Sequence, residues 1–181
     1  MNMPSVTRAL NPFADFSGIP PAVLAHAAER GTKVHAICAA LAQGLWAPDI
    51  PEECAGYVES FQGWFESRVE AVAGCEIELV DEAIGFEGHP DLICRLKGDE
   101  RLTLVDLKTP ATKNRLWVAQ LAAYRHLARL AGFDIDRVGS LRLKKNGAPP
   151  IFDEYQHSER YFAAFTSALN AYKFFSVQKG E

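Results

Sequence analysis

Charged side chains end an apolar segment near the middle of this chain. Asp106 and Lys108 lie in LTLVDLKTP, and the alternation of a β-strand places both on one face. Asp91 begins the preceding apolar segment, so antiparallel pairing of the two segments would bring it beside Asp106. Two close carboxylates repel each other and need a cation, which is either Lys108 or a divalent metal such as Mg²⁺. Taken alone, the DxK tripeptide is more typical of a surface salt bridge.

Two polar side chains interrupt the core-facing stripe of the helix that follows. Gln120 and Tyr124 are four residues apart, on one face of a helix predicted from about Lys113 to Ala131. They are either buried groups that bond to the backbone or members of the same site as Asp106.

Three upstream residues could add ligands. His35 borders the apolar stripe of a helical segment, a place where a histidine is either a hydrogen-bonded boundary residue or a metal ligand. Glu76 and Glu78 are expected on one face of the first strand, where each either adds a carboxylate or remains solvated.

Hydrophobic periodicity predicts the helices that position these residues. Residues 1–19 are expected to be a loop-like lead. One helix is predicted from Pro20 to Arg30 and a second from Thr32 to about Gly44, with Gly31 as the interruption. A third helix is expected to begin at Pro51 and to end at Gly74.

Alternating apolar residues predict strands in the second half of the chain. The expected strands contain Ile77–Leu79, Leu92–Leu96, Leu102–Val105 and Val138–Leu143, the first three as neighbours. Asn146-Gly147 predicts a hairpin, Pro149 and Pro150 favour an edge strand, and Tyr161 to Val177 predicts a final helix. This order predicts a single α/β or α+β domain over residues 1–181, with a mixed central β-sheet flanked by α-helices.

Composition limits the class of protein. The 181 residues carry 19 Lys+Arg and 23 Asp+Glu, a net charge of −4 that argues against coating nucleic acid by charge but not against a carboxylate-rich enzyme site. A chain of this size buries roughly 70% of its unfolded surface, so one core suffices.

The sequence lacks a long apolar segment and a signal-peptide pattern, which predicts a cytoplasmic protein. Four scattered cysteines, Cys38, Cys54, Cys75 and Cys94, are expected to be reduced thiols.

Four segments, in this order, resemble the RecB-type branch of the PD-(D/E)XK nuclease superfamily. They are RGTKVHAICAA, EIELVDEAIGFEGHPDLICRL, LTLVDLKTP and QLAAYRHLA, and the resemblance covers residues 20–130. The sequence is most similar to small stand-alone nucleases of phages and prophages, which share a lead like IPPAVLAHAAERG. The resemblance implies a restriction-endonuclease-like α/β fold.

The resemblance also implies a role for each residue of the metal site. His35, Asp91 and Asp106 would bind Mg²⁺ or Mn²⁺, together with the backbone carbonyl of Leu107. Lys108 would be the catalytic lysine, which either orients or deprotonates the attacking water or neutralises charge on the phosphate.

Three further roles follow from the same resemblance. Gln120 and Tyr124 correspond to a QxxxY element that positions DNA or the lysine, and Glu76 takes the place of an upstream acidic residue. Some relatives hold an iron-sulfur cluster through three cysteines near the carboxyl terminus, but no cysteine follows Cys94, so no such cluster is expected.

The implied function is a metal-dependent DNA nuclease that leaves 5′-phosphates. An exonuclease of phage, recombination or repair context is expected, with a single-strand annealing protein or a helicase on a separate chain as partner, because the sequence has no P-loop. The alternatives are a non-catalytic DNA-end-binding module, a restriction-like endonuclease and a hydrolase of RNA or a smaller phosphoester. The cations expected to contact DNA are Arg30, Lys33, Lys113, Arg115, Arg142, Lys144 and Lys145.

Overall fold

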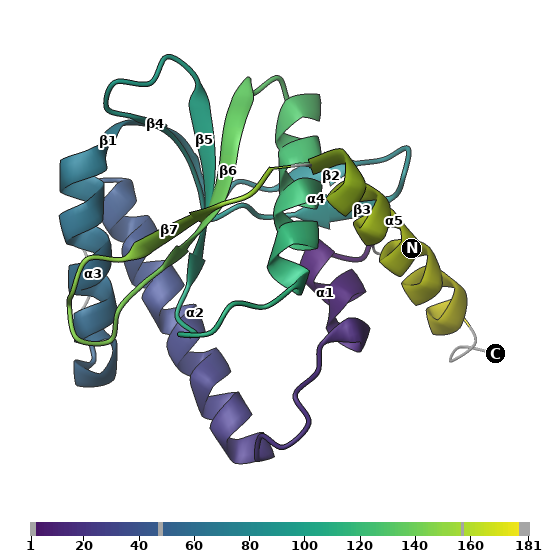
Figure 1. Cartoon of the computed structure of the whole chain (residues 1–181), viewed down its shortest axis with the longest axis horizontal. Coiled ribbons are helices and arrows are strands. Elements are labelled where there is room, and N and C mark those ends of the chain that lie inside the picture. Colours follow the sequence, from purple (N-terminus) through teal and green to yellow (C-terminus); the bar gives the residue numbers. More distant parts are fainter. Residues whose placement is uncertain (1–2, 47–48, 157, 178–181) are drawn as a thin grey trace.

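A mixed five-stranded sheet forms the centre of the molecule (Figure 1). The structure is a computed structural model that describes residues 3–46, 49–156 and 158–177. In spatial order the strands are β1 (Val69–Cys75), β4 (Leu92–Leu96), β5 (Leu102–Lys108), β6 (Ile135–Arg142) and β7 (Ile151–Glu154). Neighbours pair antiparallel except β5 and β6, which run parallel and are joined by helix α4 (Leu116–Leu130). The predicted mixed sheet is therefore confirmed, and β7 is an edge strand as expected.

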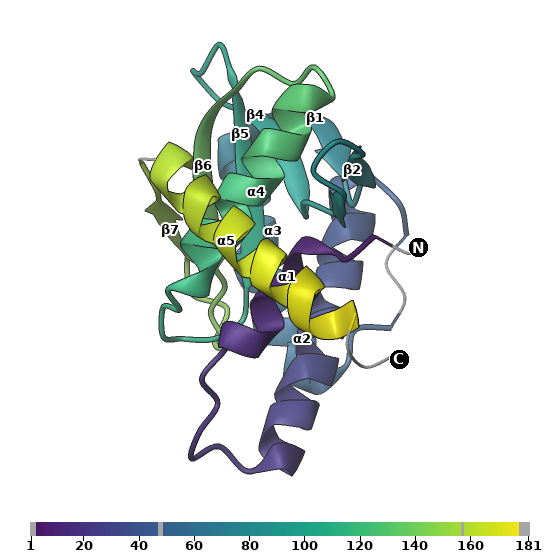
Figure 2. The same cartoon turned by 90° about the vertical axis from the view of Figure 1, so that its right-hand side faces the viewer.

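Helices cover both faces of this sheet, as Figures 1 and 2 show. Helices α2 (Pro21–Ala42) and α3 (Glu52–Arg68) pack on one face. Helix α4 packs on the other face, together with α5 (Ser158–Val177) and the short α1 (Val6–Leu10). Along β5, Leu104 faces α4 and Val105 faces α2 and α3. Because side chains alternate along a strand, Asp106 and Lys108 belong to the α4 side.

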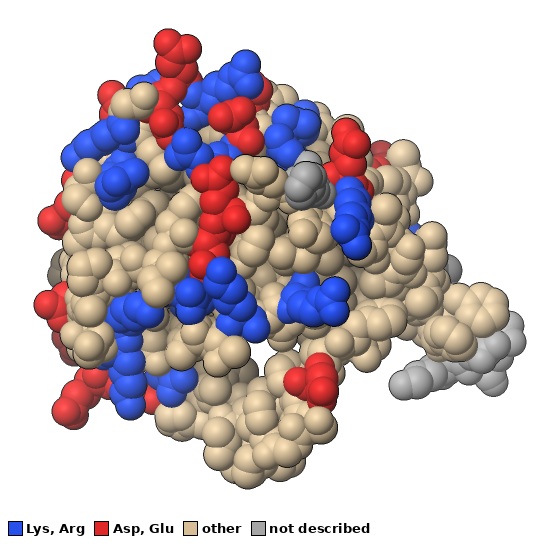
Figure 3. Space-filling view, viewed as in Figure 1, with Lys and Arg blue, Asp and Glu red and all other residues tan. Residues whose placement is uncertain are grey.

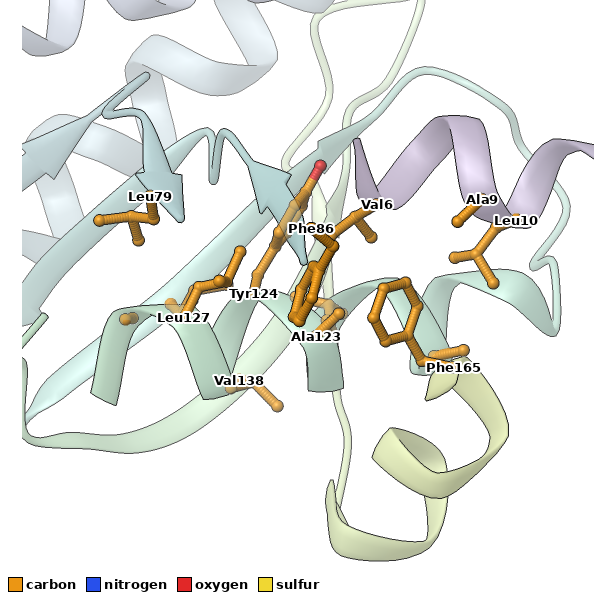
Figure 4. Packing of buried hydrophobic residues seen from close by; sticks show 14 of the residues in the cluster. Val6, Ala9, Leu10, Leu79, Phe86, Ala123, Tyr124, Leu127, Val138 and Phe165 are labelled. Atoms are coloured by element: carbon orange, nitrogen blue, oxygen red, sulfur yellow. The ribbon is translucent and has the colours of Figure 1, made fainter. Parts of the chain in front are cut away.

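The core under α4 joins segments from both ends of the chain. Phe86 lies among Val6, Tyr124 and Phe165 in this cluster (Figure 4). All four side chains are buried. The final helix was predicted from Tyr161, and the structure confirms it with a start three residues earlier.

The predicted loop-like lead is wrong for residues 6–13. Ser5 caps α1 by accepting a hydrogen bond from the Arg8 backbone N–H at 3.2 Å, and a 3₁₀ turn follows at Asn11–Phe13. Burial of Val6, Ala9 and Leu10 fixes this helix on the core. Residues 1–2 of the predicted lead, and residues 47–48, 157 and 178–181 of the predicted domain, lie outside the described residues.

Two helix boundaries also differ from the prediction. Helix α2 runs without interruption through Gly31, because one glycine costs a helix only about 1 kcal/mol and the buried stripe after it outweighs that cost. Helix α3 ends at Arg68, and Gly74 lies inside β1 instead of ending a helix. Val69 pairs with Leu96 as the first residue of that strand.

The segment predicted as the first strand does not join the central sheet. Leu79–Asp81 is β2, which pairs only with β3 (Phe86–Gly88) in a separate two-stranded sheet. Glu76 and Glu78 lie in the connection before β2, so they do not share a strand face as predicted. Glu76 has a φ of 50°, an unusual value for a residue other than glycine, and turns the chain there.

The four cysteines are free, and Cys38, Cys54 and Cys94 are buried. Within the described ranges, no helix is both long and apolar enough to cross a membrane.

Candidate active site

Strands β4 and β5 bring two carboxylates together. Leu92 pairs with Val105, so Asp91 and Asp106 meet at the same end of the two strands. The backbone N–H of Leu107 donates to Asp91 Oδ2 at 2.5 Å. Both acidic side chains are almost fully buried. The predicted convergence of the two residues is confirmed.

Helix α2 and the turn after β1 add two more groups. His35 Nδ1 lies 3.1 Å from Asp91 Oδ1. The backbone N–H of Glu76 donates to the Asp91 carbonyl at 3.3 Å, which holds the turn against β4. His35, Glu76 and Asp91 each offer one ligand atom, and these atoms lie within 4.8 Å of one another. This compact trio includes Glu76, whereas Asp106 lies next to it.

Lys108 connects the carboxylates to α4. Its Nζ lies 2.5 Å from Asp106 Oδ2 and donates to Gln120 Oε1 at 2.9 Å. Gln120 Nε2 in turn donates to the Tyr124 hydroxyl at 3.2 Å. The two polar residues on the apolar stripe therefore belong to the same network as Asp106.

Trp117, a buried residue of α4, also contacts this network. Lys108 Nζ lies 5.5 Å from the centre of its ring, within the range of a cation–π contact. Its spacing of three residues from Gln120 was the available signal, because such residues share one helix face. An apolar side chain at that spacing is ordinary in a core, so the signal was not distinctive.

Burial and mutual repulsion shape the charges of the site. Burial raises the pKa of Asp106 to about 6, with the negative charge of Asp91 adding to it and Lys108 opposing it. Partial burial of its carboxylate and the charge of Asp91 raise the pKa of Glu76 to about 7, although the residue as a whole is exposed.

The imidazole of His35 compensates Asp91 most directly. Burial disfavours the imidazolium form, but the charge of Asp91 and its hydrogen bond outweigh burial and raise the pKa of His35 to about 9. Burial likewise opposes ionisation of Asp91, and His35, Lys108 and the Leu107 N–H together lower its pKa. Protonated His35 and the ammonium group of Lys108 thus compensate part of the negative charge of the carboxylates, as a bound divalent cation would.

The donor set fits a hard divalent cation. Asp106 Oδ2 is buried and has no aligned hydrogen-bond donor among the described residues, although Lys108 Nζ is close enough for an ion pair. Carboxylate oxygens from Glu76 and Asp91, with one imidazole nitrogen from His35, stand beside it. Oxygen-rich sets of this kind suit Mg²⁺ and Mn²⁺.

Some of the cations expected to contact DNA already have a partner among the described residues, and others form no ion pair there. Lys113 and Arg142 both bind Asp153, at 2.6 and 2.5 Å, and Arg142 also donates to the Ala111 carbonyl. Arg30 lies over the ring of Tyr57, and Lys33 pairs with Glu29. Arg115, Lys144 and Lys145 form no ion pair with any described residue. Figure 3 shows Lys and Arg side chains in a row along the lower part of the body.

The larger cavities lie away from the carboxylates. One of about 780 Å³ lies between α1, α4 and α5, and one of about 480 Å³ lies between α3 and the β6–β7 hairpin. A narrow crevice beside the site is lined by His35, Cys38, Glu76 and Asp91, among others.

A family model described as the PD-(D/E)XK nuclease superfamily matches residues 20–173. The search of curated proteins found no match to the chain.

Proposed function

This chain belongs to the PD-(D/E)XK nuclease superfamily, and we propose that it is a metal-dependent deoxyribonuclease that hydrolyses phosphodiester bonds and leaves 5′-phosphate ends. The observation that carries the proposal is the meeting of His35, Asp91, Asp106 and Lys108 from three separate elements at one end of β4 and β5. A salt bridge at a strand end would explain Asp106 and Lys108, but not the partly buried histidine and the second carboxylate.

The metal-binding residues are His35, Asp91 and Asp106, with Glu76 completing the oxygen set. The Leu107 carbonyl, expected from the resemblance, is a further candidate. When bound, a divalent cation supplies Lewis acidity at the scissile phosphate and lowers the pKa of the attacking water. The protein contributes the buried cluster of donors, whose repulsion makes positive charge favourable there.

Lys108 neutralises negative charge that develops on the phosphoryl oxygens. Its ammonium group is held from two sides, by Asp106 and by Gln120, so little reorganisation is needed when the substrate arrives. Tyr124 fixes the amide of Gln120 through its hydroxyl. Neither Gln120 nor Tyr124 touches the carboxylates directly in these contacts, which makes them positioning residues for Lys108.

Within the superfamily, the order of the motifs supports the RecB-type branch and an exonuclease of phage, recombination or repair context. A cytoplasmic location and a separate annealing protein or helicase as partner belong to the same proposal. A restriction-like endonuclease is the second candidate, because the same carboxylate and lysine set serves both reactions.

End-labelled linear DNA and closed-circular DNA, each with Mg²⁺, Mn²⁺ or a chelator, test the proposal. We expect loss of linear substrate with either metal, no reaction with chelator, and released products that carry a 5′-phosphate in mass spectrometry. Asp91→Asn should abolish cleavage, while Asp134→Asn, at a carboxylate whose side chain is 76% exposed, should not.

The other readings give different results in the same assay. Cleavage of closed circles would replace the exonuclease with an endonuclease. Binding of DNA ends without any metal-dependent product would replace the enzyme with a binding module. Preference for RNA would reject the assignment to DNA.

A further inference from the structure

One part of the chain stands away from the body. We call residues 14–30 the arm: it comprises the connection after Phe13 and the first half of α2 (Figures 1 and 2). Nearly all of it is exposed, including the large apolar side chains of Phe16, Ile19 and Val23. Phe13, at its root, is 50% exposed. The arm is attached to α3 by His26, whose Nε2 lies 3.2 Å from Glu53 Oε2, and by Arg30, which lies over the ring of Tyr57. These contacts leave the three apolar side chains exposed to solvent, whereas packing against a partner would bury them.

Both ends of the arm meet the same segment of the body. At one end Phe13 lines a cavity together with Arg115 and Leu116. At the other end Gly31 approaches Thr109, whose Oγ1 lies 3.6 Å from the position of an added Cβ. The arm and segment 109–115 therefore frame an opening, which Figure 3 shows as a gap between the arm and the body.

This opening borders the candidate active site. Helix α2 continues from the arm directly to His35, one turn beyond Gly31. Segment 109–115 begins immediately after Lys108 and leads into α4, which carries Gln120. Whatever occupies the opening is therefore held beside the catalytic lysine.

The two sides of the opening have complementary chemistry. Segment 109–115 contains Lys113 and Arg115 and no acidic residue. Lys113 shares Asp153 with Arg142, so one positive charge of that trio remains uncompensated, and Arg115 forms no ion pair with a described residue. On the other side of the opening, Phe16 of the arm and Phe13 at its root are exposed. Cations for phosphates and aromatic rings for bases are the two parts of a single-strand binding site.

We propose that a single-stranded DNA end threads through the opening, with bases stacked on Phe13 and Phe16 and phosphates along Lys113 and Arg115. The inference rests on the proposed function and names the substrate of that site. A duplex does not fit this chemistry, because its bases are already stacked on each other and offer no free face. Threading requires a free end, which makes the reaction exonucleolytic by geometry.

Three single-stranded substrates of one sequence test threading: a linear strand, the same strand with streptavidin on biotin at both ends, and a ligated circle. We expect rapid Mg²⁺-dependent degradation of the free strand and protection of the other two. Equal degradation of all three overturns threading and leaves the nuclease assignment intact. No degradation of any DNA overturns the proposed function, and the binding measurement below then decides the arm separately.

Binding of a fluorescein-labelled oligothymidylate, followed by anisotropy in Ca²⁺ without Mg²⁺, isolates the arm from catalysis. Phe16→Ala should weaken binding roughly 5- to 100-fold, the range for loss of one base stack, and should leave duplex binding unchanged. Phe174→Ala is the matched control, because Phe174 is 64% exposed on α5 and lies outside the arm.

Two results of this measurement would overturn the proposal. Equal affinity of wild type and Phe16→Ala would remove the arm from DNA binding. A dimer in sedimentation that Phe16→Ala converts to a monomer would instead identify the arm as an interface between two copies of the chain.

Discussion

At the scale of single residues, Lys108 is the group on which the site converges. Asp106 of the same strand, and Gln120 and the ring of Trp117 from α4, approach its ammonium group. The side chain is only 12% exposed, so its charge is held in a partly dehydrated setting where electrostatic effects are strong. Such a group contributes to a transition state more than an equally close surface lysine would.

Replacing this lysine tests that role. Lys108→Ala should lower the single-turnover cleavage rate roughly 100- to 1,000-fold, as for loss of one preorganised stabilising group. Mn²⁺ binding, measured by electron paramagnetic resonance, should persist because the carboxylates and His35 remain. Lys97→Ala is the control, since that lysine is exposed and its ammonium group donates to the Glu66 carbonyl, away from the site. An unchanged cleavage rate in Lys108→Ala would remove the lysine from the mechanism.

The sequence was most informative at this scale. Asp91, Asp106 and Lys108 could be placed together because strand alternation and antiparallel pairing are geometric rules. The compact trio with Glu76 could not be derived in the same way. Its place depends on a backbone turn with positive φ at that residue, and a glutamate gives no local signal for such a conformation.

At the scale of elements, tertiary packing overrode local signals. Gly31 was expected to end a helix, but α2 continues through it because burial of Val34, Ile37 and Cys38 stabilises one continuous helix. Gly74 was expected to end another helix and instead lies in β1, which pairs with β4. The long-range pairing of β1 leaves no local signal, whereas the strands around the site were recognisable from their alternation.

Glycines of α3 offer a paired test of packing. A Cβ at Gly56 would overlap the backbone carbonyl of Lys145, so Gly56→Ala should destabilise the protein by about 1–3 kcal/mol by pushing the β6–β7 hairpin away. Gly63→Ala has open space and should stabilise by up to about 1 kcal/mol through helix propensity. Urea denaturation measures both. Equal effects of the two substitutions would show that α3 does not seat the hairpin as described.

The hairpin is also held by an acid-sensitive contact. Hydrogen bonds and charge from Arg142 and Lys113 outweigh the opposing effect of burial and lower the pKa of Asp153. A lowered folded-state pKa contributes stability above the unfolded pKa, near ~4, and this contribution is lost as the pH falls through the folded pKa.

Asp153→Asn should therefore lower the free energy of unfolding by about 1–3 kcal/mol at neutral pH, and the difference from wild type should vanish in strong acid. Urea denaturation across the pH range measures it. Asp134→Asn, at an exposed carboxylate, should show no such pH-dependent difference. A constant difference at all pH values would mean that ionisation of Asp153 is not what stabilises the hairpin.

At the scale of the whole molecule, the local placement of positive charge differs from what the net charge suggests. The chain is mildly acidic, yet a row of cations follows the body beside the arm (Figure 3). Arg142 was grouped with the DNA-contacting residues, but its side chain is 13% exposed and ties Asp153 to the Ala111 carbonyl, so its replacement would disturb structure. Lys144 and Lys145 have no such tie and are better probes.

The double variant Lys144→Ala/Lys145→Ala should weaken DNA binding and make its salt dependence shallower. If each lysine contacts one phosphate, the slope of log K against log salt should decrease by about 2. Titrations at several salt concentrations in Ca²⁺ measure the slope. Arg101→Ala, at a side chain 63% exposed that pairs with Asp134 and Asp136, is the control. Identical slopes for the double variant and wild type would place DNA elsewhere.

The packing of α1 on α5 has a consequence for how the enzyme is made. Val6 and Leu10 share one core with Phe165 and Leu169, so the support behind Tyr124 is incomplete until α5 has left the ribosome. Every residue of the proposed site is synthesised earlier. A chain that ends before α5 would therefore carry every residue of the proposed site without the packing that supports Tyr124.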